Sequence, residues 1–218
     1  MQDREIGGAG GGSKKGKAKG GAVVAAAVVA LAGAAGVGGE AALSANTATS
    51  GSTPGLNARK ADSKKNARDG DADRAFDRLG TRIRQKAVKQ DLECLTNSFG
   101  QVREFFLHTP CTALDRWIFA TDDGAGNVAV VSVVWVSFSD RARTKRFERL
   151  IDVYGTGDVR PLGSSLLGMA DIRFTARHYW SETRGNTITI AESEPATGHV
   201  EPDLLDAMTE VAAQLPRP

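Results

Sequence analysis

The feature that most constrains this chain is residues 20–39, an unbroken stretch of Gly, Ala, Val and Leu without a single charge. A helix of that length rises about 30 Å, which matches the hydrocarbon core of a bilayer. Only Glu40 is charged between the stretch and Arg59. The residues just before it include four lysines, Lys14, Lys15, Lys17 and Lys19. By the positive-inside rule, we expect a single-pass membrane protein with a cytoplasmic amino terminus and an extracytoplasmic remainder.

The same stretch has a second interpretation as the apolar core of a signal peptide. Small residues at 41–45 would then contain the cleavage site, and the mature protein would be secreted. The 19 residues before the stretch make a long leader for a signal peptide. We therefore expect residues 20–39 to be an uncleaved transmembrane helix and keep cleavage as the alternative.

The segments around this stretch have no pattern of a packed core. Residues 1–19 are rich in Gly and Lys, which predicts a disordered basic cytoplasmic tail. Residues 40–70 are rich in small polar residues and then in mixed charges, which is typical of a flexible spacer. Residues 71–92 suggest a basic stalk helix. Its apolar stripe would consist of Phe76, Leu79, Ile83 and Ala87.

Charge divides the chain into two unlike parts, although the formal net charge is only +2. Residues 1–92 carry 16 Lys and Arg against 9 Asp and Glu, whereas the remainder carries 12 against 17. Dense apolar runs fall almost entirely in residues 93–216, which is the size of one ordinary domain. We expect that domain to be extracytoplasmic. A transmembrane helix at 20–39 would place most of the basic residues outside the cytoplasm, away from nucleic acid. No nucleic-acid partner is therefore expected.

Two cysteines, Cys94 and Cys111, flank the first predicted helix of this domain. In an exported chain they would meet an oxidising compartment, so we expect a single disulfide, with two buried free thiols as the alternative. The helix between them presents apolar side chains on one side and ends before Pro110. Those side chains are Phe99, Val102, Phe105 and Phe106. The disulfide would tie this helix to the first strand.

A first hairpin is predicted by the DDGAGN turn at residues 122–127, which joins strands at 112–121 and 128–138. The second of these strands is apolar on both faces, so we expect it to be central and covered on both sides. A second hairpin is expected from strands at 172–181 and 187–193, with Trp180 on the same apolar face as Ile188 and Ile190. Helices are expected at 140–154 and 202–215.

The resulting order is helix, hairpin, helix, hairpin, helix. It predicts an α+β domain, with one antiparallel four-stranded sheet and helices packed on one of its faces. A transmembrane helix would precede the domain.

Several segments also carry a resemblance to a group of proteins. These are the Lys/Gly/Ala lead, the Ala/Val span, the Cys94 to Pro110-Cys111 element, and the runs VAVVSVVWVSF and FTARHYWSETRGNTITIAESEP. Together they resemble uncharacterised membrane-anchored extracytoplasmic proteins of high-GC Gram-positive bacteria. The resemblance implies an envelope location and supplies no active site.

Two groups of side chains are candidates for ligand contact. On the helix at 140–154 a basic arc could meet anionic lipid headgroups or wall polymers, although a solvated helix face, partly neutralised by Glu148 and Asp152, is the simpler interpretation. The arc consists of Arg141, Lys145, Arg146 and Arg149. On the polar face of the second hairpin, Arg173, Arg177 and Tyr179 could line a ligand surface, with ordinary cross-strand pairing as the alternative.

Residues that could perform catalysis or bind metal are scattered. The three histidines form no metal-binding pair, and His178 is interpreted as a hydrogen-bonded core side chain. Glu192 and Glu194 are two residues apart, as paired catalytic carboxylates can be, but their place beside Pro195 favours a solvated strand end. We therefore expect no metal, no cofactor and no catalytic residue.

Taken together, these patterns predict a membrane-anchored binding or interaction domain of the cell envelope. Its partner would be an envelope protein or a second copy of the chain. The alternative is an envelope hydrolase or transferase, in which Ser164 or Ser165 meets His178 and a carboxylate in a cleft.

Overall fold

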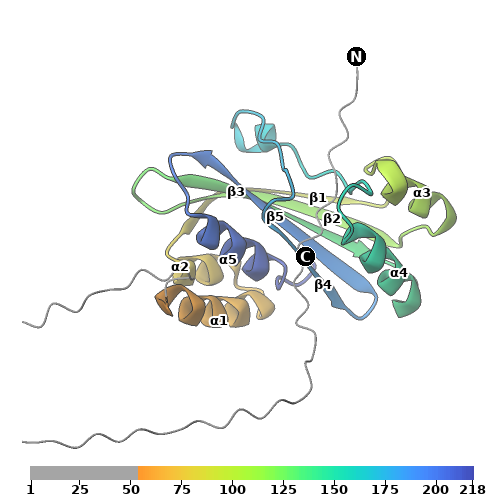
Figure 1. Ribbon diagram of the computed structural model, residues 1–218, viewed down its shortest axis with the longest axis horizontal. Coiled ribbons are helices and arrows are strands. Elements are labelled where there is room, and N and C mark those ends of the chain that lie inside the picture. Colours follow the sequence, from red (N-terminus) through yellow and green to blue (C-terminus); the bar gives the residue numbers. More distant parts are fainter. Residues whose placement is uncertain (1–53) are drawn as a thin grey trace, which may run out of the picture. The chain divides into compact units, whose positions relative to one another are not determined.

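The computed structural model describes residues 54–218, which form an α+β domain around one antiparallel sheet (Figure 1). The sheet has five strands in the order β1-β2-β3-β5-β4, so β1 and β4 are its edges. The strands are β1 (Arg82–Asp91), β2 (Ala113–Asp122), β3 (Val128–Ser137), β4 (Tyr179–Arg184) and β5 (Thr187–Thr197). The α+β class and the antiparallel sheet are confirmed, whereas the expected count of four strands is wrong.

Helices cover both faces of the sheet. One face packs against α1 (Pro54–Arg68), α2 (Ala72–Leu79) and α5 (Pro202–Ala212). The other face packs against α3 (Gly100–His108) and α4 (Arg141–Ile151), and the short 3-10 helix η1 (Ser164–Leu167) joins this side. The expectation that helices lie on one face is therefore also wrong (Figure 1).

The core on the α1–α2–α5 side is built from alternate residues of β3. Val131, Val133 and Trp135 point to this side and pack with Phe76 of α2 and Met208 of α5. The indole Nε1 of Trp135 donates a hydrogen bond to the carbonyl of Leu215 at 3.0 Å, so the end of the chain is held against the sheet.

The intervening residues of β3 pack on the α3–α4 side. Val134 and Val136 contact a cluster that includes Ile188 and Ile190 of β5. Four rings from α3, α4 and the end of β3 pack edge-on, tilted or stacked within the same cluster, and these are Phe105, Phe106, Phe138 and Phe147. The expectation that strand 128–138 is central and covered on both faces is confirmed. An exposed apolar sheet face, which would have argued for a protein partner, is not present on this strand.

Residues 71–92 do not form one helix. Gly80 adopts a left-handed conformation with φ 88° and ends α2, and the chain then extends into β1. Ile83 packs with the α1–α2–α5 cluster, while Ala87 packs against the opposite side of the sheet. The 3.6-residue spacing of the apolar side chains therefore spans a helix and a strand, and the predicted stalk helix is wrong.

The folded part also begins earlier than residue 93. Helix α1 occupies residues expected to be spacer, and its Leu56 and Ala67 are buried. Lys60 and Lys64 both form ion pairs with Glu210 of α5. The described part of the predicted spacer and the predicted stalk thus belong to the same domain as residues 93–216.

The second hairpin differs from its prediction in length and phase. Residues 172–178 are not a strand, and Ala176 has a φ of 61°, which interrupts the expected alternation. Strand β4 begins at Tyr179, which lies on the side of Ile188 and Ile190. Trp180 lies on the opposite side, with the α1–α2–α5 cluster, so the predicted apolar face is wrong at this position.

The predicted cytoplasmic tail at 1–19 and the predicted membrane span at 20–39 lie outside the described residues. Within residues 54–218, none of the helices combines the length and apolar character needed to cross a membrane.

Candidate functional site

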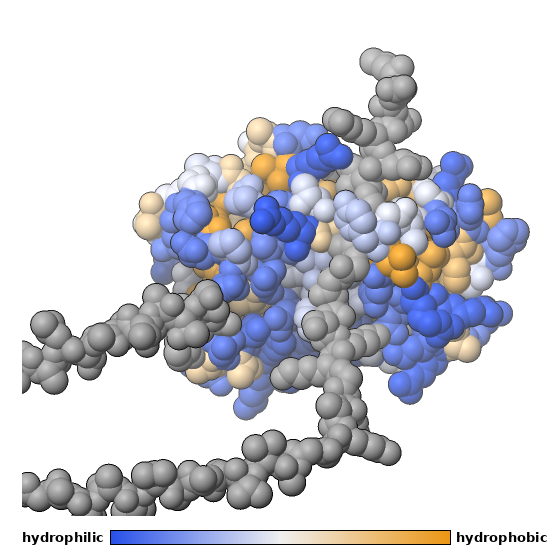
Figure 2. Space-filling model, in the orientation of Figure 1, coloured by the Kyte–Doolittle hydropathy of each residue, from blue (hydrophilic) through white to orange (hydrophobic). Residues whose placement is uncertain are grey.

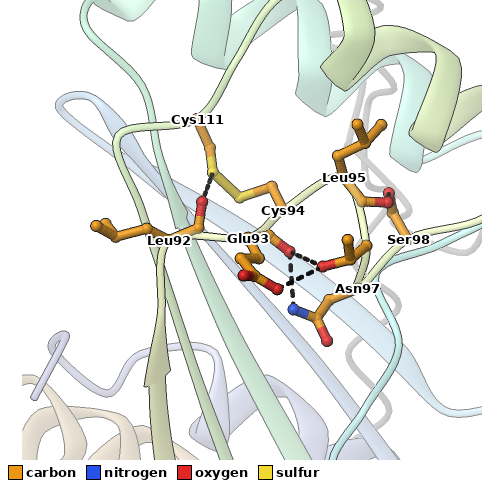
Figure 3. Close-up of a disulfide and its surroundings, with 8 residues drawn as sticks. Leu92, Glu93, Cys94, Leu95, Asn97, Ser98 and Cys111 are labelled. Atoms are coloured by element: carbon orange, nitrogen blue, oxygen red, sulfur yellow. Dashed lines mark hydrogen bonds between the residues drawn. A yellow bond between two sulfur atoms is a disulfide. The ribbon is translucent and has the colours of Figure 1, made fainter.

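The disulfide joins Cys94 and Cys111 next to the first helix of the α3–α4 side (Figure 3). Their Cα atoms are 6.3 Å apart, and Cys94 is buried. The turn that presents Cys94 is closed by Asn97, whose amide Nδ2 donates to the carbonyl of Glu93 at 2.7 Å. The disulfide therefore links the segment after β1 to the segment that enters β2, on both sides of α3.

A row of polar side chains crosses the α3–α4 side of the sheet. Register places Ile118 of β2 opposite Ser132 of β3, and Ser132 opposite Glu192 of β5. Glu192 in turn lies opposite Tyr179 of β4. Directly paired residues point to the same face of a sheet, so the last three form a continuous polar row. The row separates two apolar clusters on this side.

This polar row, Ser132, Glu192 and Tyr179, is deeply buried. The three side chains are 2%, 5% and 6% exposed. Asp158, 7% exposed, approaches the row from the loop after α4. Two carboxyl groups and two hydroxyl groups therefore lie in the interior on one side of the sheet.

The loop that carries Asp158 is held by backbone pairing with the start of α3. The amide of Phe99 donates to the carbonyl of Asp158 at 3.0 Å, and the amide of Val102 donates to Thr156. Gly157, with φ 94°, lies so close to the carbonyl of Phe99 that a Cβ there would collide with it. Glycine at this position therefore lets the loop and helix approach closely enough to place Asp158 in the interior.

Burial shifts the protonation of both carboxyl groups. It raises the pKa of Asp158 to about 7, although a hydrogen bond from the Val159 amide favours the ionised form. Burial also raises the pKa of Glu192 well above its ordinary value, and the charge of Asp158 adds to this effect. Neither carboxylate forms an ion pair with a cation of the described chain. Two nearby carboxyls without a cation retain a proton at pH values where exposed acids have lost theirs.

Tyr179 connects this row to α4. Its hydroxyl donates to Asp152 Oδ1 at 3.1 Å, and the hydroxyl of Ser181 donates to the same oxygen at 2.7 Å. Burial, and next the charge of Asp152, raise the pKa of the Tyr179 phenol well above its ordinary value. Tyr179 therefore stays a neutral hydrogen-bond donor at physiological pH.

Chemically, buried carboxyl groups with raised pKa values can hold a proton near neutral pH, which general acid–base sites require. Residues 54–218 contain no cluster of three or more His, Cys, Asp or Glu able to hold a metal ion. Two surface pockets of about 330 and 340 Å³ lie elsewhere, one beside β1 and β2 and one at the β2–β3 turn.

The predicted basic arc lies along α4. Arg141, Arg146 and Arg149 are exposed, and Figure 2 shows strongly hydrophilic residues over this region. Lys145 is partly buried and pairs with Glu148 at 2.8 Å. The structure thus leaves three of the four predicted cations open to an external anion.

The predicted group Arg173, Arg177 and Tyr179 is not assembled on a sheet face. Both arginines are exposed in the irregular segment before β4, whereas Tyr179 is buried in the polar row. The physical reason is the positive φ of Ala176. It breaks the alternation of side chains between the two faces, so residues before Ala176 and residues of β4 do not follow one pattern.

The residues of the alternative hydrolase lie in different places. His178 is buried, and its Nδ1 lies 2.6 Å from Asp206 Oδ1 of α5, which confirms a hydrogen-bonded core histidine. The hydroxyl of Ser164 donates to the carbonyl of Ala170 at 2.7 Å and accepts from the amide of Ile172. Both hydrogen bonds stabilise the loop that follows η1.

Comparison of the chain with protein-family models, with curated proteins and with solved structures finds no match.

The interpretation of Glu192 as part of a solvated strand end is wrong, while Glu194 beside it is partly exposed. One signal in the sequence could have indicated a buried polar row. Ser132 interrupts the apolar alternation of Val130, Val134 and Val136 in the middle of a central strand. A hydroxyl in that position implies polar neighbours on the adjacent strands.

Proposed function

We propose that this chain is a binding domain of the cell envelope, displayed outside the cytoplasm and held at the membrane by residues 20–39. The observation that carries the proposal is the disulfide between Cys94 and Cys111, which lies within the folded domain. Disulfides of this kind persist in oxidising compartments and are rare in the cytosol. The charge-free stretch after a lysine-rich tail supports the same location.

The disulfide allows a direct test in cells that produce the full chain. Free thiols are alkylated at the moment of lysis with a maleimide that carries a large polymer, and the protein is compared with and without prior reduction. We expect a mobility shift only after reduction. A full shift without reduction would show two free thiols and would overturn the proposed location. A Cys111→Ala variant, which leaves one thiol, serves as the positive control for labelling.

Helix α4 offers a contact surface for anionic envelope components. Arg146 and Arg149 are exposed on it, and exposed cations near a membrane attract anionic headgroups through ordinary electrostatics. The variant Arg146→Glu/Arg149→Glu should bind vesicles containing anionic lipid more weakly than the wild-type chain. Lys65→Glu/Arg78→Glu, on α1 and α2, changes the net charge equally and is the matched control.

A second candidate function, an acid–base enzyme of the envelope, is favoured by the buried pair Asp158 and Glu192. It would use these carboxyls rather than the serine and histidine side chains considered from the sequence. Incubation of envelope extract with wild type and with Glu192→Gln tests it, with product detection by mass spectrometry. A product made by wild type and absent with the variant supports the enzyme, and identical profiles count against it.

A further inference from the structure

Within residues 54–218, the outer edge of β1 has no second strand beside it. β1 is the terminal strand of the sheet and pairs only with β2 among the described strands. Its ten residues therefore present unpaired backbone donors and acceptors along one side. Most of its side chains are exposed, and Leu92 just after the strand is 77% exposed. An edge of this length can accept one more strand through main-chain hydrogen bonds.

The two sides of β1 differ in character. On the α3–α4 side lie the cations Arg82 and Lys89, which are register partners of Asp122 and Arg116, and Arg84 at a bulge nearby. Arg84 forms an ion pair with Asp122, and Lys89 lies 3.5 Å from Asp91. On the α1–α2 side lie Ile83 and Val88 with a single cation, Lys86.

A pocket of about 330 Å³ lies beside the edge on the α1–α2 side. Ile83 and Lys86 of β1 line it together with the rings of Trp117 and Phe119 of β2. Trp117 and Ile83 are only partly buried, so the pocket has an open apolar floor. Three acidic side chains, Asp69, Asp71 and Asp73, line the opposite wall. An acidic side chain is therefore disfavoured in the pocket, although cations dominate the other side of the strand.

These features select among occupants of the edge. A second copy paired through β1 would bring together two strands that each carry four cations against the single carboxylate of Asp91, and this excess of like charge destabilises a strand pair. Residues 1–53 of the same chain carry more basic than acidic side chains and are disfavoured for the same reason. An extended segment of another protein, with acidic residues at every second position and apolar residues between them, matches both sides of β1.

We infer that β1 is a docking edge for an extended acidic segment of a partner protein. That segment adds a sixth strand to the sheet, its acidic side chains face Arg82, Arg84 and Lys89, and an apolar side chain enters the pocket over Trp117 and Ile83. The inference rests on the proposed binding function and names its surface and the chemistry of its partner.

The probe for the test is a fluorescent octapeptide in which glutamate and valine alternate, with its ends acetylated and amidated. Binding of this alternating peptide to the full-length protein in detergent is followed by fluorescence anisotropy at low salt. We expect saturable binding that weakens as salt is added. We also expect slower amide hydrogen exchange in β1 when the peptide is bound.

Two control peptides separate the alternating pattern from composition and charge. The first has all its glutamates before all its valines, so it keeps the composition of the probe without the alternation. The second replaces each glutamate of the probe by lysine, which reverses the charge. Both should bind at least about tenfold more weakly than the alternating peptide, equivalent to about 1.4 kcal/mol.

The site is located by the variant Arg82→Glu/Lys89→Glu, whose two side chains are exposed on the α3–α4 side of β1. We expect it to bind the alternating peptide about tenfold more weakly, whereas the charge-matched control Arg103→Glu/Arg177→Glu, at two exposed positions outside β1, binds like wild type. Absence of saturable binding to wild type would overturn the inference. So would equal binding by the β1 variant, or exchange protection outside β1. Because this test does not depend on topology, it can succeed even if the cysteines prove to be reduced in cells.

Discussion

Asp158 and Glu192 approach each other on the α3–α4 side of the sheet, and the charge of Asp158 raises the pKa of Glu192. One comes from the loop after α4 and the other from β5, and both are buried. Each raised pKa means that the folded chain binds protons more tightly than the unfolded chain does. The pair therefore makes the stability of the domain depend on pH in a defined direction.

Because both pKa values are raised, this contribution to stability is fully present below the unfolded value of about 4. The part due to Asp158 is lost as pH rises through about 7, and the part due to Glu192 is lost as pH rises through its own raised pKa. We expect the free energy of unfolding of wild type to fall as pH rises from about 4 towards about 7, by up to about 1.4 kcal/mol per pH unit for each group. Glu192→Gln should show a shallower fall. Urea unfolding at several pH values measures both. Equal slopes for the two proteins would contradict this account of the pair.

The close approach of Gly157 to Phe99 predicts an unequal effect of two alanine substitutions. Gly157 and Gly126 share a φ of 94°, but a Cβ at Gly126 has no atom within 4 Å. Gly126→Ala should therefore cost about 1 kcal/mol for the strained backbone alone. Gly157→Ala adds a collision with Phe99 and should cost more than about 3 kcal/mol. Thermal and urea unfolding measure the loss of stability in each variant. An equal loss in Gly157→Ala and Gly126→Ala would contradict the account, because it would mean that the loop can move away from Phe99.

The disulfide should stabilise the domain by about 3 kcal/mol, since it closes a loop with a sequence separation of 17. Cys94→Ala/Cys111→Ala should unfold at lower urea concentration than wild type. Reductant should lower the midpoint of wild type and leave that of the variant unchanged. A wild-type midpoint insensitive to full reduction would show that the crosslink contributes little.

The domain boundary can be tested with two fragments. Residues 54–218 contain β1 and the helices α1 and α2, whose Phe76 is fully buried against the sheet. Residues 93–218 lack all three elements and would expose Phe119 and the edge of β2. We expect the longer fragment to unfold cooperatively and the shorter one to aggregate or unfold without a transition. A cooperative transition in the shorter fragment would restore residue 93 as the boundary.

Much of the described fold can be predicted from local patterns. The β2–β3 hairpin follows from its turn and from the doubly apolar β3, while α3, α4 and α5 follow from the spacing of their apolar residues. Local patterns do not predict the strand at residues 82–91, because Ile83 and Ala87 continue the helical spacing of Phe76 and Leu79 by coincidence. The left-handed Gly80 ends α2, and Thr81 follows it before β1 begins at Arg82.

The polar row is less accessible to prediction. Glu192 lies between Ser132 and Tyr179 in register, and Asp158 is close enough for its charge to raise the pKa of Glu192. These relationships join residues far apart in the sequence. Alternation carried through Ala176 assigns Tyr179 to a polar face, but the positive φ of Ala176 resets the phase. The spacing of apolar residues in the sequence cannot reveal such a break, because the break depends on the backbone conformation of one residue.

The central claim is that the folded domain lies outside the cytoplasm, and proteolysis of intact cells tests it most directly. Protease is added to whole cells or spheroplasts and to lysed cells, and the domain is followed with an antibody against residues 54–218. The account predicts that external protease reaches the domain in intact cells while a cytoplasmic marker stays whole. A domain that survives in intact cells and is digested only after lysis would contradict it.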